Sequence, residues 1–401
     1  MAERAVIVGA ARTPFGKLGG AFREVPAVRL GGLAIKEAVQ RAGLQPSDIE
    51  KSIMGMVLQG GAGQVPARQA ALEAGLPWGA ASETVNKVCA SGMRAVTMAD
   101  QAIRSGDGSV IVAGGMESMS GAPFALKSCR WGNRMGHGTA LDLMLHDGLT
   151  CPFGSVHMGV YGDQAAAEWG ITRQEQDEWA LRSHLRAVKA IEGGKLAEET
   201  VPVRLTGRSG GDTIVATDEM PRKDANIAAM AGLSPLFSAH GTVTAGNAPG
   251  VNDGAAALVL MAEREARARG IRPLATIAGH AEAALEPSRI AEAPGHAIRK
   301  LLSATGYSIK DITLIEVNEA FAAVVLTSGK LVGWNAEQVN VNGGAIALGH
   351  PIGASGARII ISLIYELRRR GGGLGIAAIC SGTGQGDAML IKVEGTGRND
   401  A

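Results

Sequence analysis

The segment ASGMR at residues 90–94 recurs as ASGAR at residues 354–358, at an offset of about 264 residues. Each copy begins a helix-like stretch that ends in a glycine-rich turn, and a buried strand follows, at residues 109–113 and 374–379. A single repeated pentapeptide arises easily by chance, but further matches occur in the same order at nearly the same offset. They are Gly43 with Gly306 and Asp48 with Asp311. The sequence therefore predicts a duplicated chain, with helices packed on an apolar sheet in each α/β half.

A large insertion interrupts the first half. The segment DGAA at residues 253–256 resembles GDA at residues 386–388, at an offset of only about 134 residues. The difference of about 130 residues predicts an insertion that is too long for an ordinary loop. We expect it to be a small domain that shapes a substrate site; mediating oligomer contacts is the alternative or additional role. The predicted parts are residues 1–118 with 252–272 (N-terminal half), 119–251 (inserted domain) and 273–401 (C-terminal half).

Composition excludes several classes of function. Lys plus Arg number 39 and Asp plus Glu 38, so nothing indicates a nucleic-acid partner or an anionic membrane surface. No apolar run approaches the ~18 residues of a membrane-spanning helix, and we expect neither a signal peptide nor a peroxisomal signal. Four scattered cysteines without a CxxC pair argue against a disulfide framework or a zinc site. We expect a cytoplasmic protein in which Cys129 and Cys151 are small buried apolar residues.

Cys89 stands in the polar turn NKVCASG at residues 86–92, where a periodic apolar run predicts the start of a helix. At a helix N-terminus, exposed amide groups and the helix dipole favour the thiolate form of a cysteine. A buried structural cysteine is the alternative, but Asn86, Lys87 and Ser91 make this turn polar. We therefore interpret Cys89 as a candidate nucleophile.

His350 lies in the glycine-rich loop NGGAIALGHPIG at residues 342–353. The surrounding glycines allow another backbone segment or a ligand to approach closely. A structural histidine with satisfied hydrogen bonds is the alternative. The concentration of glycines favours a site, in which an imidazole activates the thiol.

Cys380 ends a buried apolar run and begins the segment SGTGQG at residues 381–386. A phosphate loop would require a following Lys-Ser/Thr pair and a helix, and neither is evident. A backbone nest that binds an oxyanion fits better. By the repeat, Cys380 aligns with Met116, so both strands present a sulfur at the equivalent end. We interpret Cys380 as a group that transfers a proton.

A fourth segment, EVNEAFA at residues 316–322, follows an apolar strand. Asn318 is suited to donate to developing negative charge or to hold a water molecule. Glu319 is suited to orient an imidazole. A helix-capping segment without a catalytic role is the alternative.

Together these segments resemble the four motifs of the thiolase family, in the family's order. They are the turn at Cys89, NEAF at residues 318–321, the Gly-His-Pro loop at His350 and Cys-x-Gly-x-Gly at Cys380. The resemblance covers essentially the whole chain, including ARTPFG at residues 11–16 and the inserted domain. It implies an α/β thiolase fold: two duplicated halves with five-stranded sheets, packed around shared central helices.

The resemblance also implies a role for each residue of these motifs. His350 takes the proton from Cys89, whose thiolate attacks an acyl-CoA and becomes a thioester. Cys380 removes an α-proton from acetyl-CoA, or protonates the acetyl-CoA enolate in the reverse direction. His350 and a water molecule on Asn318 hold the enolate oxygen. The backbone amides of Cys89 and Gly382 hold the oxyanion of the acyl group.

Coenzyme A thioesters are the implied substrates, with no permanently bound cofactor and no metal. Pro249 departs from the pattern, because the family commonly has a serine at this position near the cofactor. Proline removes a hydroxyl and an amide donor, which puts the binding strength or acyl preference at that edge in question. The residues assigned to coenzyme A binding by the resemblance are His157, Met158, Arg222, Phe237, Ala245, Gly246, Ala320 and Phe321.

The segment RWGNRMG at residues 130–136 resembles the family's tetramerisation loop, so a homotetramer built from dimers is expected, with a simple dimer as the alternative. The leading hypothesis for the activity is an acetyl-CoA acetyltransferase that catalyses reversible Claisen condensation, since HMG at residues 157–159 is typical of short-chain members. The alternatives are a broader-chain 3-ketoacyl-CoA thiolase and a non-catalytic acyl-CoA-binding protein.

Overall fold

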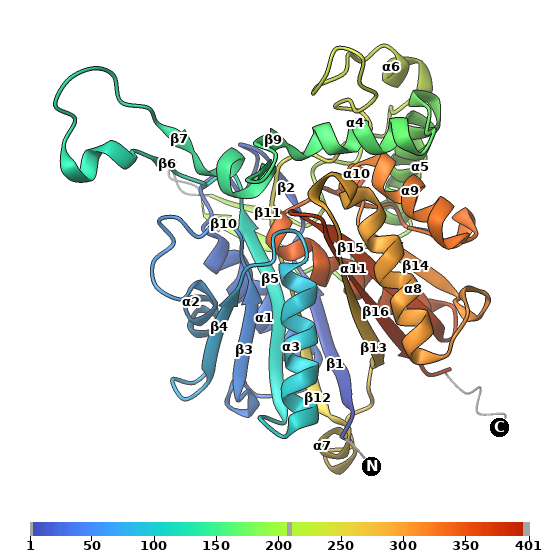
Figure 1. Ribbon diagram of the computed structural model, residues 1–401. Helices are drawn as coiled ribbons and strands as arrows, with labels where there is room; N and C mark the ends of the chain where they lie inside the picture. Colours follow the sequence, from blue (N-terminus) through green and yellow to red (C-terminus); the bar gives the residue numbers. More distant parts are fainter. Residues whose placement is uncertain (1–2, 207–210, 396–401) are drawn as a thin grey trace.

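The computed structural model describes residues 3–206 and 211–395. The C-terminal residues that would carry a peroxisomal signal lie outside these ranges. Two α/β halves stand next to each other, and most helices of the inserted segment lie across one end of them (Figure 1). Both described ends of the chain lie at the opposite end of the molecule. The predicted α/β architecture is confirmed.

The sheet of the N-terminal half has the strand order β4-β3-β5-β12-β1. Its strand β12 follows the inserted segment in sequence and pairs antiparallel with both β5 and β1. Helices α1 and α2 pack on the outer face of this sheet through a core of Ala, Val, Ile, Leu and Met side chains. The elements are β1 (Ala5–Arg12), β2 (Gly16–Lys17), α1 (Ala27–Arg41), β3 (Lys51–Gly55), α2 (Pro66–Glu73), β4 (Ala81–Val85), α3 (Ser91–Ser105), β5 (Val110–Ser118), β12 (Asn252–Ala262) and α7 (Glu263–Ala268).

Among the described residues, the C-terminal half repeats this arrangement with four strands in place of the expected five, in the order β14-β15-β16-β13. In place of the strand that would correspond to β4, Val339 makes a single parallel bridge to Ile315. Helices α8 and α9 cover the outer face through a separate core. The elements are β13 (Ala275–Ala284), α8 (Ala293–Thr305), β14 (Leu314–Val317), α9 (Ala322–Val332), α10 (Ala345–Leu348), α11 (Ile352–Arg369), β15 (Gly373–Ser381) and β16 (Gln385–Val393).

The two sheets meet along one edge. Strands β1 and β13 pair antiparallel at two positions, Val6 with Thr276 and Ile7 with Ala275, so the two sheets form one continuous ladder. The sequence did not predict this connection. It has a simple physical advantage, because pairing two edge strands with each other removes both as exposed edges.

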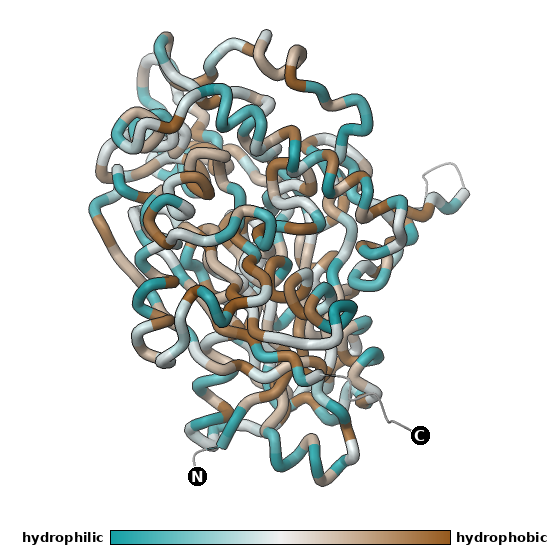
Figure 2. The backbone as a smooth tube through the Cα atoms, turned by 90° about the vertical axis from the view of Figure 1, so that its right-hand side faces the viewer, coloured by the Kyte–Doolittle hydropathy of each residue, from teal (hydrophilic) through white to brown (hydrophobic). Residues whose placement is uncertain are grey.

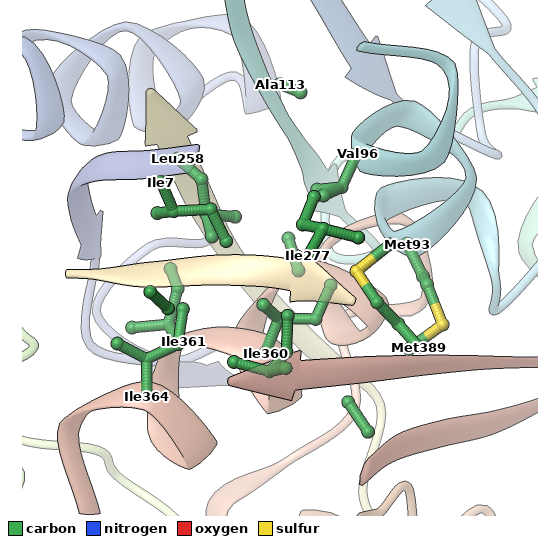
Figure 3. Packing of buried hydrophobic residues seen from close by; sticks show 14 of the residues in the cluster. Ile7, Met93, Val96, Ala113, Leu258, Ile277, Ile360, Ile361, Ile364 and Met389 are labelled. Atoms are coloured by element: carbon green, nitrogen blue, oxygen red, sulfur yellow. The ribbon is translucent and has the colours of Figure 1, made fainter. Parts of the chain in front are cut away.

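Helices α3 and α11 lie between the inner faces of the two sheets and contact each other. Figure 3 shows this central core, in which Met93 and Val96 of α3 and Ile360 of α11 point towards strand residues such as Leu258 and Ile277. Hydrophobic segments gather in the interior of the molecule, whereas hydrophilic segments are more frequent near its outside (Figure 2). The repeated ASG segments lie at the N-terminal ends of these two central helices.

The repeat also appears in local backbone structure. Gly43 and Gly306 both adopt left-handed conformations, with φ of 68° and 77°. Gly43 follows the C-cap residue of α1, and Gly306 is the C-cap residue of α8. Asp48 and Asp311 each accept a backbone N–H at 2.7 Å, from Gln45 and Ser308 respectively, in a capping box. Matching turn chemistry at matching positions confirms the predicted duplication.

The inserted segment is tied to the N-terminal half by a buried cluster of charges. The Arg12 guanidinium on β1 donates to Glu199 at 2.6 Å and to both carboxylate oxygens of Asp218 at 2.7 and 2.9 Å. All three side chains are buried. The elements of the segment are β6 (Phe124–Ala125), β7 (Leu141–Asp142), β8 (Thr150–Cys151), β9 (Val156–His157), α4 (Met158–Glu168), α5 (Arg173–Glu192), β10 (Val203–Thr206), β11 (Asp212–Val215) and α6 (Ile227–Ala231).

The predictions for the two remaining cysteines have different outcomes. Cys151 is buried, as expected, in the apolar cluster around α4. Cys129 is exposed, so the prediction that it is buried is wrong. It lies between β6 and β7 on a loop that projects from the body of the molecule, where there is no core to bury it (Figure 1). Among the helices of the described residues, none has the length and apolar character to cross a membrane.

Candidate active site

One cavity of about 380 Å³ lies between the two halves and the inserted segment, and its lining is mostly apolar. The structure brings nearly all of the predicted site residues to it. From the two halves these are Cys89, Ala320, Phe321, His350, Cys380 and Gly382, and from the inserted segment His157, Met158, Arg222, Phe237 and Ala245. Asn318 and Gly246 are not among the lining residues: Asn318 lies behind His350, and the Gly246 amide donates to Thr244 Oγ1 at 3.1 Å.

Cys89 lies in the tight turn that leads into α3, two residues before the first helical residue, Ser91. Val88 in this turn has φ of 44°, which is unusual for a β-branched residue. The Ser91 hydroxyl stabilises the turn, because it accepts the Lys87 N–H at 2.8 Å and donates to the Val88 carbonyl at 2.6 Å. The turn thus places the thiol at the cavity rather than within the helix.

The prediction that the helix start holds Cys89 as a thiolate is wrong for the free protein. Burial raises the pKa of the Cys89 thiol to about 12, although backbone N–H groups of Gly382 and Cys89 at the sulfur oppose the rise. Loss of solvation therefore outweighs the amide groups, and the sulfur keeps its proton at neutral pH. A base is required to activate this thiol. The same two N–H groups converge at the sulfur, where an oxyanion formed next to it would need donors.

His350 is buried and held in one orientation. Its backbone N–H donates to Asn252 Oδ1 at 2.8 Å, and its Nδ1 lies 2.6 Å from Ser355 Oγ. The single hydroxyl hydrogen of Ser355 is directed to the Pro351 carbonyl, 2.9 Å away. We therefore assign the imidazole hydrogen to Nδ1, which donates to Ser355 and leaves the lone pair on Nε2. This tautomer has an acceptor available for a proton.

Burial and, secondarily, the positive charge of Arg358 lower the pKa of His350 to about 3. The imidazole is therefore neutral at neutral pH. A neutral imidazole and a protonated thiol that line the same cavity are the resting form of a nucleophile and its general base, rather than a preformed ion pair.

Cys380 lies near the end of β15, at the position that corresponds to Met116 near the end of β5. Burial raises the pKa of the Cys380 thiol well above its usual range, and the neighbouring Cys89 sulfur raises it further. The second sulfur is therefore close to the first and is protonated in the free protein. Such a buried thiol is suited to give a proton to a carbanion-like intermediate.

Asn318 and Glu319 follow β14 and have different surroundings. Asn318 Nδ2 is 3.5 Å from both ring nitrogens of His350, so it faces the ring without a short hydrogen bond to either nitrogen. Its Oδ1 is buried and has no hydrogen-bond partner among the described residues. Glu319 accepts hydrogen bonds from Trp179 Nε1 at 2.9 Å and Ser183 Oγ at 2.7 Å, both on α5. No hydrogen bond between Glu319 and His350 occurs in the part of the chain that the structure describes, so the prediction that Glu319 orients the imidazole is wrong; Ser355 does so.

Aromatic rings line the cavity on the side of the inserted segment. His157 stacks on Phe237 with ring centroids 4.4 Å apart, and Phe237 meets Phe321 edge to face at 6.3 Å. Gly159 lies directly against Phe237, and a Cβ there would come within 2.1 Å of the ring. Pro249, the residue that departs from the family pattern, also lines the cavity.

Sequence reasoning missed three residues that hold the site together. Ser355 orients His350, and Asn252 fixes the backbone of the same loop. Glu117, buried at the end of β5, accepts the N–H groups of Val57 at 3.0 Å and Leu58 at 3.1 Å, and also that of Gly353 near the start of α11. Burial raises the pKa of Glu117 to about 7 against these hydrogen bonds. The recurring serine of the ASG repeat was the available signal for Ser355.

No group of three or more His, Cys, Asp or Glu side chains suited to a metal ion occurs within residues 3–206 and 211–395. The two thiols, the imidazole and the backbone amides are the reactive groups that meet at the cavity. These groups can form and resolve a thioester and exchange a proton with carbon.

Comparison with known proteins gives a consistent result. The family model of the thiolase N-terminal domain matches residues 5–264, and that of the thiolase C-terminal domain matches residues 271–393. The acetyl-CoA acetyltransferase of Cupriavidus necator is 47% identical over 387 residues, which cover 96% of this chain and 98% of that protein. An acetyl-CoA acetyltransferase of Escherichia coli K12 is 47% identical over 97% of this chain and 99% of its own length. The crystal structure of the Bacillus anthracis acetyl-CoA acetyltransferase superposes with a TM-score of 0.95 at 43% identity, covering 98% of this chain and 99% of that one. With both domain models matched and these relatives aligned over nearly their full length, the chain belongs to the thiolase family.

Proposed function

We propose that the chain is an acetyl-CoA C-acetyltransferase, which condenses two acetyl-CoA molecules and, in reverse, cleaves 3-ketoacyl-CoA with coenzyme A. The observation that carries the proposal is one apolar cavity in which two thiols from opposite repeats meet a neutral imidazole. The names of relatives that are 47% identical over nearly the whole chain support acetyl-CoA as the substrate.

Formation of the acyl-enzyme begins at Cys89. Nε2 of His350 takes the thiol proton, and the sulfur attacks the carbonyl carbon of an acyl-CoA. The amides of Cys89 and Gly382 donate to the oxyanion. The bond between the carbonyl carbon and the sulfur of coenzyme A then breaks, and the departing thiolate takes the proton from His350. Cys89 is left as an acyl thioester.

The protonation states suit the cleavage direction equally well. His350 takes the proton of Cys89, the resulting thiolate attacks the 3-keto carbon of a 3-ketoacyl-CoA, and the carbon–carbon bond breaks. The acetyl-CoA enolate formed takes the proton of Cys380, which burial keeps on the sulfur until that moment. The orphan Oδ1 of Asn318 supports a role for Asn318 in holding a water molecule at the enolate oxygen. Coenzyme A then gives its thiol proton to Cys380 and takes the acyl group from Cys89, whose sulfur regains its proton from His350.

Residues of the inserted segment are proposed to hold the coenzyme A part of the substrate. Stacking of His157 on Phe237 and the edge contact to Phe321 form an apolar wall of the kind that a pantetheine arm would contact. Met158, Arg222, Ala245 and Ala320 line the same cavity. Gly246 lies next to Ala245 in sequence, and a Cβ there would come within 2.7 Å of Leu233 Cδ1, so any larger residue would force Leu233 to shift.

Thiolysis rates with substrates of different length test the proposed substrate. We expect kcat/KM for acetoacetyl-CoA to exceed that for an eight-carbon 3-ketoacyl-CoA by about tenfold or more, because even one methylene group that does not fit a pocket costs about 1–3 kcal/mol. Both rates are measured under the same conditions with excess coenzyme A. A clear preference for the longer chain would make the protein a broader-chain 3-ketoacyl-CoA thiolase. Binding of acetyl-CoA without any acetylation of Cys89 would make it a non-catalytic binding protein.

Ser355→Ala tests the assigned tautomer of His350. Without the hydroxyl that accepts the Nδ1 hydrogen, the imidazole loses the partner that keeps Nε2 unprotonated. We expect kcat of thiolysis to fall about tenfold, the value of a typical hydrogen bond of about 1.4 kcal/mol, with KM changed less than threefold. Steady-state kinetics measure both. A loss confined to KM would show that Ser355 does not act through the base.

We further propose a cytoplasmic homotetramer whose inserted domain, residues 119–251, contributes both substrate and subunit contacts. Phe124, Leu126, Trp131 and Met135 support the subunit contacts, because each exposes at least 52% of its surface on the projecting loop. Sedimentation equilibrium of the protein tests the tetramer, and a simple dimer is the alternative outcome.

A further inference from the structure

Lys87 connects the turn of Cys89 to the opposite half of the molecule. Its Nζ lies 2.9 Å from Asp387 Oδ1 on β16 and 2.5 Å from Glu282 Oε2 on β13. The Lys87 and Asp387 side chains are 12% and 3% exposed, so this contact is largely shielded from water. Lys87 belongs to the N-terminal half, and both acidic residues belong to the C-terminal half. An ion pair with so little exposure depends strongly on the presence of both partners.

Asp387, one of the two acidic partners of Lys87, lies close in the sheet to Cys380, the second thiol. Asp387 pairs with Ile379 across the antiparallel strands β15 and β16, and Gly386 pairs with Cys380. A second contact runs parallel to the first, since the hydroxyl of Ser381, the residue after Cys380, donates to the Lys87 carbonyl oxygen. The backbone of Lys87 is therefore fixed to β15, which carries Cys380, and its side chain to the neighbouring strands β16 and β13.

The turn between Lys87 and Cys89 needs such an external support. Val88 has φ of 44°, a left-handed conformation that costs a β-branched residue free energy and persists only where surrounding contacts maintain it. The Val88 side chain packs over Gly382, where a Cβ would lie 3.2 Å from Val88 Cγ1. If the turn relaxed, Cys89 would move relative to the Gly382 amide at its sulfur.

We propose that Lys87 is a positioning residue, whose ammonium group, held by Asp387 and Glu282, keeps the Cys89 sulfur in register with the Gly382 amide and the Cys380 thiol. The inference rests on the proposed thiolase reaction and adds a residue to it. Lys87 does not touch the reacting atoms; it acts through the turn. The half-reaction that depends on Cys89 and Gly382 is therefore more sensitive to Lys87 than the proton transfer at Cys380, whose strand stays in the sheet.

Lys87→Met removes the charge and keeps the length of the side chain. We expect the rate of Cys89 acylation by acetyl-CoA, followed by rapid quenching and mass measurement, to fall about 30-fold, within the range typical of lost positioning. In contrast, α-proton exchange should change less than threefold. It is measured by NMR in D2O with a coenzyme A ketone analogue, in which a methylene group replaces the thioester sulfur so that no acyl group can be transferred. The KM for acetoacetyl-CoA should also change less than threefold.

Arg94→Met is the matched control. Arg94 on α3 donates to the same Glu282, at 2.7 Å, but does not belong to the turn, and among the described residues no hydrogen bond or ion pair joins it to Asp387. We expect its acylation rate to stay within threefold of the unmodified protein. Lys87→Arg keeps the charge and should recover most of the acylation that Lys87→Met loses.

Asp387→Asn provides an independent variant if Lys87→Met folds poorly. It weakens the ion pair from the other side, and it should lower acylation more than α-proton exchange. Equal losses in the two half-reactions, or equal acylation by Lys87→Met and Arg94→Met, would overturn the positioning role. Absence of acylation in the unmodified protein would instead overturn the proposed function, so the two failures are distinguishable.

Discussion

Replacement of Cys89 by serine is expected to abolish acyl-enzyme formation and to reduce thiolysis by about 10⁴-fold or more, the scale seen when a catalytic nucleophile is removed. The cavity gives the physical reason. Burial raises the pKa of the thiol to about 12 and would disfavour the still less acidic serine alkoxide even more strongly. A neutral imidazole can remove a proton from the thiol in the transition state but has much less driving force towards a hydroxyl.

The measurement is the intact mass of the protein after incubation with acetyl-CoA, together with the steady-state rate of acetoacetyl-CoA thiolysis. Cys129→Ser is the appropriate control, because Cys129 is exposed on the projecting loop and is not among the cavity residues. It should acquire the acetyl group as the unmodified protein does. Acetylation of Cys89→Ser at an undiminished rate would mean that another residue is the nucleophile.

Cys380→Ser should separate the two half-reactions. The serine variant still contains Cys89, His350 and the Gly382 amide, so we expect acylation of Cys89 by acetyl-CoA to stay within about threefold. Condensation and cleavage should fall by about 10³-fold, in the range that a missing general acid or base produces. The reason is that a serine hydroxyl is a much poorer proton donor to an enolate than a thiol.

Rapid-quench acylation and coupled thiolysis assays on the same preparation give the two rates. Loss of both activities to the same extent would contradict the division of work between the sulfurs. It would indicate that Cys380 instead supports the position of Cys89. The two thiols are close enough for this, since the Cys89 sulfur raises the pKa of the Cys380 thiol.

Features carried by local sequence were predictable. The repeated ASG segments and the paired Gly and Asp positions predicted the duplication, because the same turn chemistry is needed in each copy. The four motifs led to residues that line one cavity, although this came from a family resemblance and not from periodicity. The apolar periodicity predicted a helix that starts at Cys89, and the first helical residue is Ser91, two positions later.

Features that depend on contacts between distant segments were not predictable. The protonation state of Cys89 depends on desolvation, which a linear pattern of residues does not contain. Glu319 was adjacent to a catalytic segment in sequence, yet its hydrogen bonds run to α5 of the inserted segment. The pairing of β1 with β13 rests on two residue pairs whose members are about 270 positions apart in sequence. No connecting turn joins the two strands directly, so the local sequence carries no signal for their register.

The origin of the reacting groups in opposite repeats has a consequence for the integrity of the catalyst. Nucleophile and proton carrier belong to different repeats, so a slight rotation of one half against the other would misalign them while every helix and strand stays intact. Heat or mild denaturant is therefore expected to abolish the activity before the protein unfolds. The pairing of β1 with β13 and the packing of α3 on α11 join the two halves and oppose such a rotation.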